Sequence, residues 1–216
     1  MHVGIVGGTG PAGMGLALRL AAAEVQVTVG SRTADRATER VEEAVGKWAD
    51  RDLRILADQN HGAAGADIVV IATPWDAAVA TASDLADVLA GKVVVSMANA
   101  LQRVGEEFQP LIPPRGSVAE SVQACLERSH VGAAFHHVPA RLLSNLDHDL
   151  DCDVLVCADR PEAIEQTERL VASIPGLRPI TAGSLSLAGA VEAFTGVLLN
   201  VNVRHKARAS IRLTGL

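Results

Sequence analysis

Residues 1–15, MHVGIVGGTGPAGMG, decide the fold of this chain. A β-branched run typical of a strand is followed by three glycines in the spacing G-x-G-x-x-G, and an Ala- and Leu-rich helical run comes next. Gly8 permits a tight turn, Gly10 lets backbone N–H groups approach a diphosphate, and Gly13 lets helix and strand pack closely. This order predicts a Rossmann-type dinucleotide site with the diphosphate at the helix N-terminus. A glycine-rich turn in another kind of α/β protein is the alternative.

The end of the second apolar run, at residues 25–29, indicates which dinucleotide is bound. An NAD-binding protein places Asp or Glu there to accept the ribose hydroxyls. This chain instead carries Ser31 and Arg32, a hydroxyl and a planar guanidinium that suit a 2′-phosphate. Arg36 follows four residues later and is either a second phosphate ligand or a solvated surface charge. The sequence therefore predicts NADP(H) as the nucleotide.

Composition excludes several classes of partner. The chain has 216 residues, of which 49% are hydrophobic and 20% charged, as in a globular protein with a substantial core. A net charge of −6, with three Phe, two Trp and no Tyr, argues against binding to nucleic acid. We find no apolar run near the ~18 residues that span a bilayer, so we expect no membrane segment. A core strand directly after Met1 leaves no room for a signal peptide, and we expect a cytoplasmic protein.

The three cysteines have no metal-ligand spacing, so we expect no metal site and no disulfide framework. Apolar runs alternate with helical stretches, which predicts an α/β fold with a Rossmann-type doubly wound parallel sheet. Strands are expected at residues 3–6, 25–29, 53–56, 68–72, 93–96, 131–135, 154–157 and 178–180. Helices are expected at residues 12–23, 34–48, 76–89, 118–128, 162–174 and 186–208.

We expect two domains, an NADP-binding Rossmann domain at residues 1–142 and a smaller C-terminal α/β domain at 143–216 that completes the acceptor cleft. The proline-rich segment 108–116 is expected to be extended, either a plain connection or a lid over the site. The last helix is largely apolar, so it is buried in its own domain or against another subunit, and we favour a homodimer.

A basic pattern follows in the C-terminal segment. Arg204, Arg208 and Arg212 are spaced by four residues, so a continuous helix would carry all three on one face. This stripe either pairs with the helix C-terminal dipole or docks an acidic ligand tail.

The chemistry is expected at the carboxyl ends of the strands, where ligands bind in doubly wound sheets. Thr73 and Pro74 follow the fourth strand, Asn99 follows the fifth, and His136 and His137 follow the sixth. Without a Tyr, the chain has no Tyr-x-x-x-Lys proton relay, and a ketone reductase would need one histidine as its acid. The alternative is that the histidines line the cleft. An acceptor that takes a hydride into a delocalised ring needs no strong acid, only two rings held ~3–3.5 Å apart.

The chain resembles the NADPH-dependent coenzyme F420 reductases (F420:NADP oxidoreductases) in motifs spread over nearly its whole length. These motifs are Gly7-Gly8-Thr9-Gly10, Gly30-Ser31-Arg32, Thr73-Pro74-Trp75, Phe135-His136-His137-Val138-Pro139 and Gly176-Leu177-Arg178-Pro179. The resemblance implies hydride transfer between NADP(H) and the deazaflavin coenzyme F420 in a homodimer with two domains per subunit. Small-molecule redox cofactors are then its partners.

The resemblance also implies roles for individual residues, and it assigns no catalytic acid or base. The implied diphosphate ligands are Thr9, Gly10, Pro11 and Ala12; the 2′-phosphate ligands are Ser31, Arg32 and Arg36; the nicotinamide ribose is flanked by Thr73 and Pro74; His136 and Val138 line the hydride-transfer site; and the deazaflavin lies near Ala98 and Asn99. The sequence departs from the family pattern at residues 96–100 and at His137. Two other functions remain open, an NADPH-dependent reductase of an imine, ketone or flavin, and a non-catalytic NADP-binding protein.

Overall fold

The computed structural model describes residues 1–216, and eight of its strands form one sheet in the order β10-β9-β8-β5-β4-β1-β2-β3. The strands are β1 (His2–Val6), β2 (Gln26–Ser31), β3 (Ile55–Gln59), β4 (Ile68–Ile71), β5 (Val93–Ser96), β6 (Leu101–Val104), β7 (Glu107–Pro110), β8 (His130–Ala133), β9 (Cys152–Ala158) and β10 (Leu177–Gly183). The helices are α1 (Pro11–Ala22), α2 (Ala34–Gly46), α3 (Asn60–Ala63), α4 (Trp75–Asp84), α5 (Ala86–Leu89), α6 (Val118–Cys125), α7 (Ala140–Leu143), α8 (Pro161–Ala172), the 3₁₀ turn η1 (Leu185–Leu187) and α9 (Ala188–His205).

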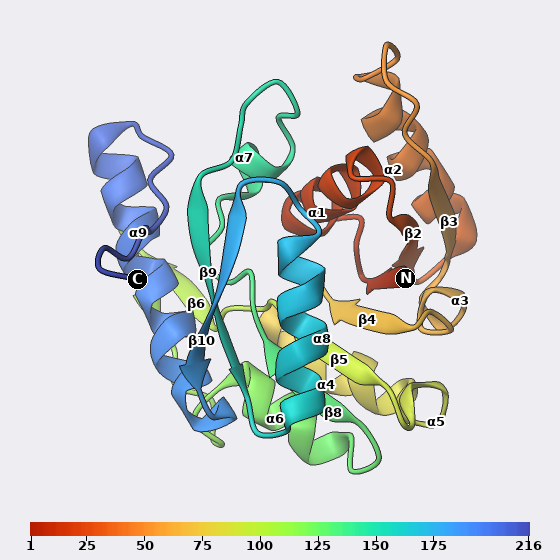
Figure 1. Cartoon of the computed structure of the whole chain (residues 1–216). Coiled ribbons are helices and arrows are strands. Elements are labelled where there is room, and N and C mark those ends of the chain that lie inside the picture. Colours follow the sequence, from red (N-terminus) through yellow and green to blue (C-terminus); the bar gives the residue numbers. More distant parts are fainter.

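The order β3-β2-β1-β4-β5-β8 is that of a Rossmann fold, and every pairing within it is parallel. Figure 1 shows α1 and α8 in front of the sheet and α4 and α6 behind it. Strands β2 and β3 lie on one side of β1, whereas β4 and β5 lie on its other side. The switch point is therefore between β1 and β4, where a doubly wound sheet opens its ligand crevice. The predicted fold class is confirmed.

The core lies in two apolar layers, one on each face of the sheet. In β5, Val93 and Val95 pack into the layer beneath α1 and α8, whereas Val94 packs into the layer beneath α4 and α6. Both faces of the central strands are buried, which explains why their sequences are almost continuously apolar instead of alternating.

The two outermost strands extend this sheet with a change of direction. β9 pairs antiparallel with β8 through only two positions, Gly132 with Ala158 and Ala133 with Cys157, and β10 then pairs parallel with β9. The expected domain boundary at residue 142 falls inside α7, and the strands beyond it belong to the same sheet. The division into residues 1–142 and 143–216 therefore stays a prediction, namely that the first part binds the nucleotide and the second part completes the acceptor cleft.

Three local expectations differ from the structure. The segment expected to be an extended loop begins as the second strand of a hairpin, because β6 and β7 pair with each other through Leu101 and Pro110 at its base. The helix expected at residues 76–89 divides into α4 and α5 at Leu85. The last helix ends at His205, where Lys206 takes a left-handed conformation with φ of 50° and stops the helix.

The early end of α9 overturns the expected basic stripe. Arg208 and Arg212 lie in the tail beyond the helix, so they share no helical face with Arg204. Arg204 pairs with Glu107 of the hairpin. In Figure 1 the tail turns back from the end of α9 and the C-terminus lies in front of that helix. Arg212 of the tail pairs with Asp151 and Asp153 at the start of β9. Arg204 and Arg212 are thus held by carboxylates of their own chain.

A buried carboxylate anchors this tail. Asp153 is fully buried and accepts from Arg178 Nε at 2.7 Å, from Arg212 Nη1 at 2.9 Å and from the backbone N–H of Leu213 at 2.6 Å. These donors, Arg178 first, hold the pKa of Asp153 well below its usual range. The C-terminal tail is therefore fixed to the outer strands by charge-assisted hydrogen bonds.

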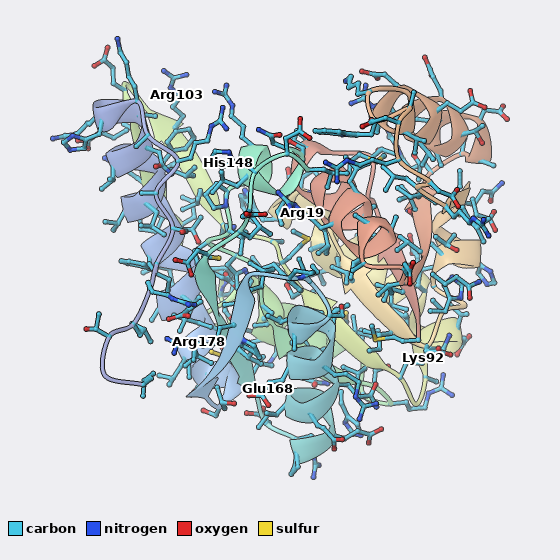
Figure 2. The ribbon with its side chains drawn as sticks, turned by 45° about the horizontal axis from the view of Figure 1, so that its top comes forward. Arg19, Lys92, Arg103, His148, Glu168 and Arg178 are labelled. Atoms are coloured by element: carbon cyan, nitrogen blue, oxygen red, sulfur yellow. The ribbon has the colours of Figure 1, made fainter.

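A second polar contact fixes the segment after α7 to the dinucleotide helix. Arg19 of α1 donates to the backbone carbonyls of Leu142, Leu143, Asn145 and His148. Figure 2 shows Arg19 beside the segment that carries His148. One guanidinium therefore binds two carbonyls of α7, those of Leu142 and Leu143, and two carbonyls of the segment that follows it, and so fixes this segment to α1.

The segment Leu185–His205 is long and apolar enough to cross a membrane, contrary to the sequence expectation. A single helix of this kind is weak evidence for a membrane protein. Two polar side chains attach it to its own chain, since Glu192 accepts from the N–H groups at the start of α6 and Asn200 exchanges two hydrogen bonds with Phe108.

Candidate functional site

A cleft of about 480 Å³ opens at the carboxyl ends of the central strands. Its walls come from the glycine loop and the start of α1, from residues 72–75 after β4, and from residues 97–99 after β5, with Leu101 and Arg36 at its margin. Another depression, of about 540 Å³, lies at the opposite edge of the sheet beside the start of β2 and contains no strand-end residue of the crevice. The cleft at the switch point is therefore the candidate site.

The glycine loop is shaped by contacts that leave no room for side chains. Gly7 has a φ of +68°, and a Cβ there would lie 2.4 Å from Thr73 Cγ2. The tight turn predicted for Gly8 is thus made by Gly7, while a Cβ on Gly8 would lie 2.8 Å from the carbonyl oxygen of Ile5. A Cβ on Gly13 would lie 2.7 Å from Gly8 Cα, so that position allows the close packing expected of it.

Gly10 differs from these glycines, because a Cβ there would meet no atom within 4 Å. The space in front of Gly10 is open, and the N-terminus of α1 follows with Pro11 as its first residue and no acid in its first turn. The N–H groups of a first helical turn lack intrahelical acceptors and favour an anion. This geometry fits a diphosphate held by residues 9–12.

Two hydrogen bonds to residues distant in the sequence fix the glycine loop. The N–H of Gly7 donates to Asn60 Oδ1 at 3.0 Å, and the N–H of Gly8 donates to the carbonyl of Gly30 at 3.0 Å. Asn60 begins α3, a short helix with no periodic signal, so sequence reasoning missed this contact. The two bonds align the loop with the end of β2, where the expected phosphate ligands lie.

Of the three expected 2′-phosphate ligands, the structure brings only Arg36 to the cleft. Arg36 lies in the first turn of α2 and lines the cleft, whereas Ser31 is buried at the end of β2 and Arg32 is exposed just beyond it. Neither arginine pairs with a carboxylate of this chain. Two unpaired guanidinium groups beside a helix N-terminus are suited to an added phosphate.

The opposite wall of the cleft holds polar atoms without partners. Thr73 Oγ1 and Asn99 Oδ1 are buried and make no hydrogen bond. Asn99 Nδ2 donates to the carbonyl of His136 at 3.0 Å, which fixes the orientation of the amide. Since buried polar atoms are nearly always hydrogen-bonded, these two oxygens fit a ligand that brings donors to the cleft.

His136 and Val138 lie behind this wall and are not part of the present lining. Both are buried, and neither nitrogen of the His136 ring has a hydrogen bond. Burial first, and then the neighbouring His137, lower the pKa of His136 to about 3, so the ring is neutral near pH 7. Their expected place beside the reacting rings stays a prediction.

His137 is no better placed to act as an acid. Its Nε2 accepts from the backbone N–H of Leu155 at 3.2 Å, and burial lowers its pKa to about 4. Arg36 is then the only ionisable side chain in the lining of the cleft. The cleft therefore offers a cation at one end and no proton donor of the usual catalytic kind at the other.

Sequence reasoning missed several lining residues. Trp75, Met97 and Leu101 line the cleft together with the expected Pro74 and Ala98, and they make this part of the lining apolar. Trp75 was visible as part of the Thr73-Pro74-Trp75 motif, but nothing in the sequence indicated that it lines the cleft.

The buried His136 makes stability depend on pH in a defined direction. The pKa of His136 is about 3 in the folded protein and 6.5 in its ordinary state, so between these values the unfolded chain binds the extra proton. The contribution of the neutral, buried His136 to the free energy of unfolding is fully present above pH 6.5. Below pH 6.5 this contribution decreases by about 1.4 kcal/mol per pH unit. We expect the free energy of unfolding, measured in urea between pH 7 and 5, to fall less steeply in His136→Gln.

The exposed His148 provides the control, since His148→Gln should keep the wild-type slope. Other titrating groups, including Glu192 with a pKa raised to about 7 by burial, are common to both proteins and cancel in the difference. Equal slopes in His136→Gln and wild type would show that His136 is not held neutral.

Comparisons with known proteins identify the family of the chain. Residues 2–100 match the model of a family described as NADP oxidoreductase, coenzyme F420-dependent. The chain is similar to the F420-dependent NADP reductases of Methanocaldococcus jannaschii (37% identical, covering 100% of this chain and 99% of that protein) and Methanothermobacter thermautotrophicus (33%, covering 100% and 96%). A crystal structure of a protein from Arthrobacter sp. FB24, provisionally described as an F420-dependent NADP reductase, has the same fold (TM-score 0.79, 21% identical, covering 98% and 99%). The chain belongs to the coenzyme F420-dependent NADP oxidoreductase family.

Proposed function

We propose that this protein transfers a hydride between NADP(H) and the deazaflavin coenzyme F420. The observation that carries the proposal is the lining of the cleft, which has a cation near its nucleotide end and no acid at its acceptor end. A ketone or imine reductase needs a placed proton donor, whereas a delocalised ring system stabilises the added charge itself. The relatives named F420-dependent NADP reductase, similar over the whole chain, support the same acceptor.

The residues present fit the nucleotide. Open space at Gly10, the unpaired Arg32 and Arg36, and the unpartnered Thr73 Oγ1 each match a different part of NADP(H). In this proposal, the cofactor-binding residues are Gly8, Thr9, Gly10, Pro11, Ala12, Gly13, Ser31, Arg32, Arg36, Thr73, Pro74, Ala98 and Asn99. When bound, NADPH supplies the hydride and the deazaflavin accepts it.

The chain's own contribution to catalysis is binding and orientation. The helix N-terminus and the arginines hold one end of the nucleotide, and the fixed amide of Asn99 contacts its other end. Trp75, Met97 and Leu101 supply an apolar wall against which a flat ring packs without water. Bringing two reactants into register in this way lowers the barrier without any group that exchanges a proton.

An acceptor comparison tests the function. The purified protein is mixed with NADPH and, in separate reactions, coenzyme F420, a simple ketone, an imine and a flavin, while absorbances of NADPH and the acceptor are followed. We expect turnover with coenzyme F420 alone, because the cleft has no acid for the carbonyl or imine. Turnover of the ketone or imine without the deazaflavin would contradict the proposal, and tight NADP binding without any turnover would indicate a non-catalytic protein.

The 2′-phosphate ligands give a second test. Arg36→Ala and Arg32→Ala should each weaken NADPH binding by roughly 1.5–3 kcal/mol, the range for a hydrogen bond to a charged group, and NADH binding much less. Arg40→Ala is the matched control, since Arg40 lies one turn further along α2 and already pairs with Glu43. Binding is measured by fluorescence titration. Equal losses for NADPH and NADH would refute the phosphate assignment.

We also propose a cytoplasmic homodimer in which residues 143–216 carry the interface and complete the acceptor side of the cleft. The three cysteines are unpaired, as in a reducing compartment. Leu187, Phe194 and Val197 are exposed on one side of α9 and its preceding turn, at spacings of seven and three residues. An exposed apolar stripe of this kind is typical of a surface that a second copy covers.

Val197→Glu should convert the dimer to a monomer, because it would bury a carboxylate in that apolar surface. Val203→Glu is a matched control, since Val203 is 54% exposed, against 53% for Val197, but lies on another side of α9. Size-exclusion chromatography with light scattering measures the mass of each variant. A monomeric wild-type protein at micromolar concentration would contradict the proposal.

A further inference from the structure

The loop beside the cleft begins where β8 leaves the sheet. The β8–β9 ladder ends at the pair Ala133–Cys157. Phe135 then takes a φ of +65°, which is rare for a residue with a side chain, and turns the chain away from β9. β9 continues beyond this point as far as Cys152. Along this part of β9, the backbone N–H groups on the β8 side have no β8 carbonyl to accept their hydrogen bonds.

Two different groups replace the missing strand. The N–H of Leu155 donates to Nε2 of His137 at 3.2 Å, and the N–H of Asp153 donates to the carbonyl of Ile211 in the C-terminal tail at 2.9 Å. Residues 153, 155 and 157 alternate along the strand and present their N–H groups to the same edge. The imidazole of His137 therefore takes the place of a strand carbonyl, one ladder step beyond the end of β8.

This contact determines the state of the ring. An Nε2 that accepts a hydrogen bond carries no proton, so the neutral ring has its proton on Nδ1. Burial lowers the pKa of His137 to about 4, which keeps the ring neutral near pH 7. Nδ1 has no hydrogen-bond partner, so the bond to Leu155 is the only one that the side chain makes.

The same loop reaches the cleft on its other side. The carbonyl of His136, the neighbouring residue, accepts from Asn99 Nδ2 at 3.0 Å, and Asn99 lines the cleft. The loop at residues 135–138 is thus held between β9 and the end of β5. His137 is the residue of this loop whose side chain makes a hydrogen bond to β9.

We propose that His137 is a positioning residue, whose neutral imidazole replaces the missing strand acceptor and so fixes the loop at residues 135–138 against the acceptor end of the cleft. The residue acts through the backbone of β9 and of the loop and touches no reacting atom. The measurements of kcat rest on the proposed function, whereas the NMR and hydrogen-exchange measurements do not.

Two measurements on the wild-type protein test the contact without activity. Nitrogen-15 NMR of the labelled imidazole should show an unprotonated Nε2 and a protonated Nδ1 at pH 7. Hydrogen exchange should show that the Leu155 amide is protected. A protonated Nε2, or a Leu155 amide that exchanges freely, would overturn the proposal even if every variant failed to fold.

The variants separate positioning from general stability. His137→Leu fills a similar volume without an acceptor, and His137→Gln retains a neutral acceptor. We expect His137→Leu to speed exchange of the Leu155 amide and to lower kcat with coenzyme F420 by about tenfold, the scale of an unsatisfied buried donor. The Kd for NADPH should change less than kcat, because the proposed diphosphate and 2′-phosphate ligands lie in the glycine loop and the start of α1, around the end of β2 and in the first turn of α2, and none of them is in the loop that His137 holds.

His137→Gln should restore most of the protection and of kcat, and His148→Leu, at an exposed site, should leave both unchanged. Wild-type kcat in His137→Leu, or a joint loss of kcat and NADPH affinity that His137→Gln fails to rescue, would overturn the proposal. A wild-type protein inactive toward coenzyme F420 would refute the proposed function instead, and the NMR and exchange results would still decide the role of His137.

Discussion

The site depends on close packing between the glycine loop and the end of β4. A Cβ on Gly7 would lie 2.4 Å from Thr73 Cγ2, and a Cβ on Gly13 would lie 3.0 Å from that of Ala72. With hydrogen in place of these side chains, the N-terminus of α1 reaches the edge of the sheet at the switch point. The same contact brings the helix dipole and Thr73 to opposite sides of one cleft, so a single steric constraint establishes both walls.

Charge is distributed unevenly along this cleft, and the distribution follows from burial. Arg36 is an exposed guanidinium in the lining, whereas the two histidines behind the other end are desolvated and stay neutral near pH 7. Desolvation is the largest cause of both shifts, and at His137 it outweighs the nearby carboxylate of Asp153, which by itself would raise the pKa. The protein therefore attracts a phosphate at one end and presents an uncharged surface at the other, an arrangement suited to two stacked rings.

The sequence predicted the features that depend on local order. The periodicity of apolar residues located every strand of the main sheet, and the glycine spacing located the nucleotide loop. It failed for contacts between distant segments: Gly7 with Asn60, Asp153 with Arg212, and the β6–β7 hairpin against α9. The basic stripe failed for a related reason, because a four-residue spacing has meaning only if the helix continues, and α9 ends at His205.

The segment after β8 shows why such contacts carry function that periodicity does not reveal. Between Phe135 and His148, hydrogen bonds join side chains to the backbone of distant segments: Arg19 donates to four carbonyls of this segment, and His137 accepts from one N–H of β9. Backbone ladders tolerate almost any residue, but these two bonds require a particular side chain. The acceptor end of the cleft is therefore determined by individual residues, whereas the nucleotide end is determined by the fold itself.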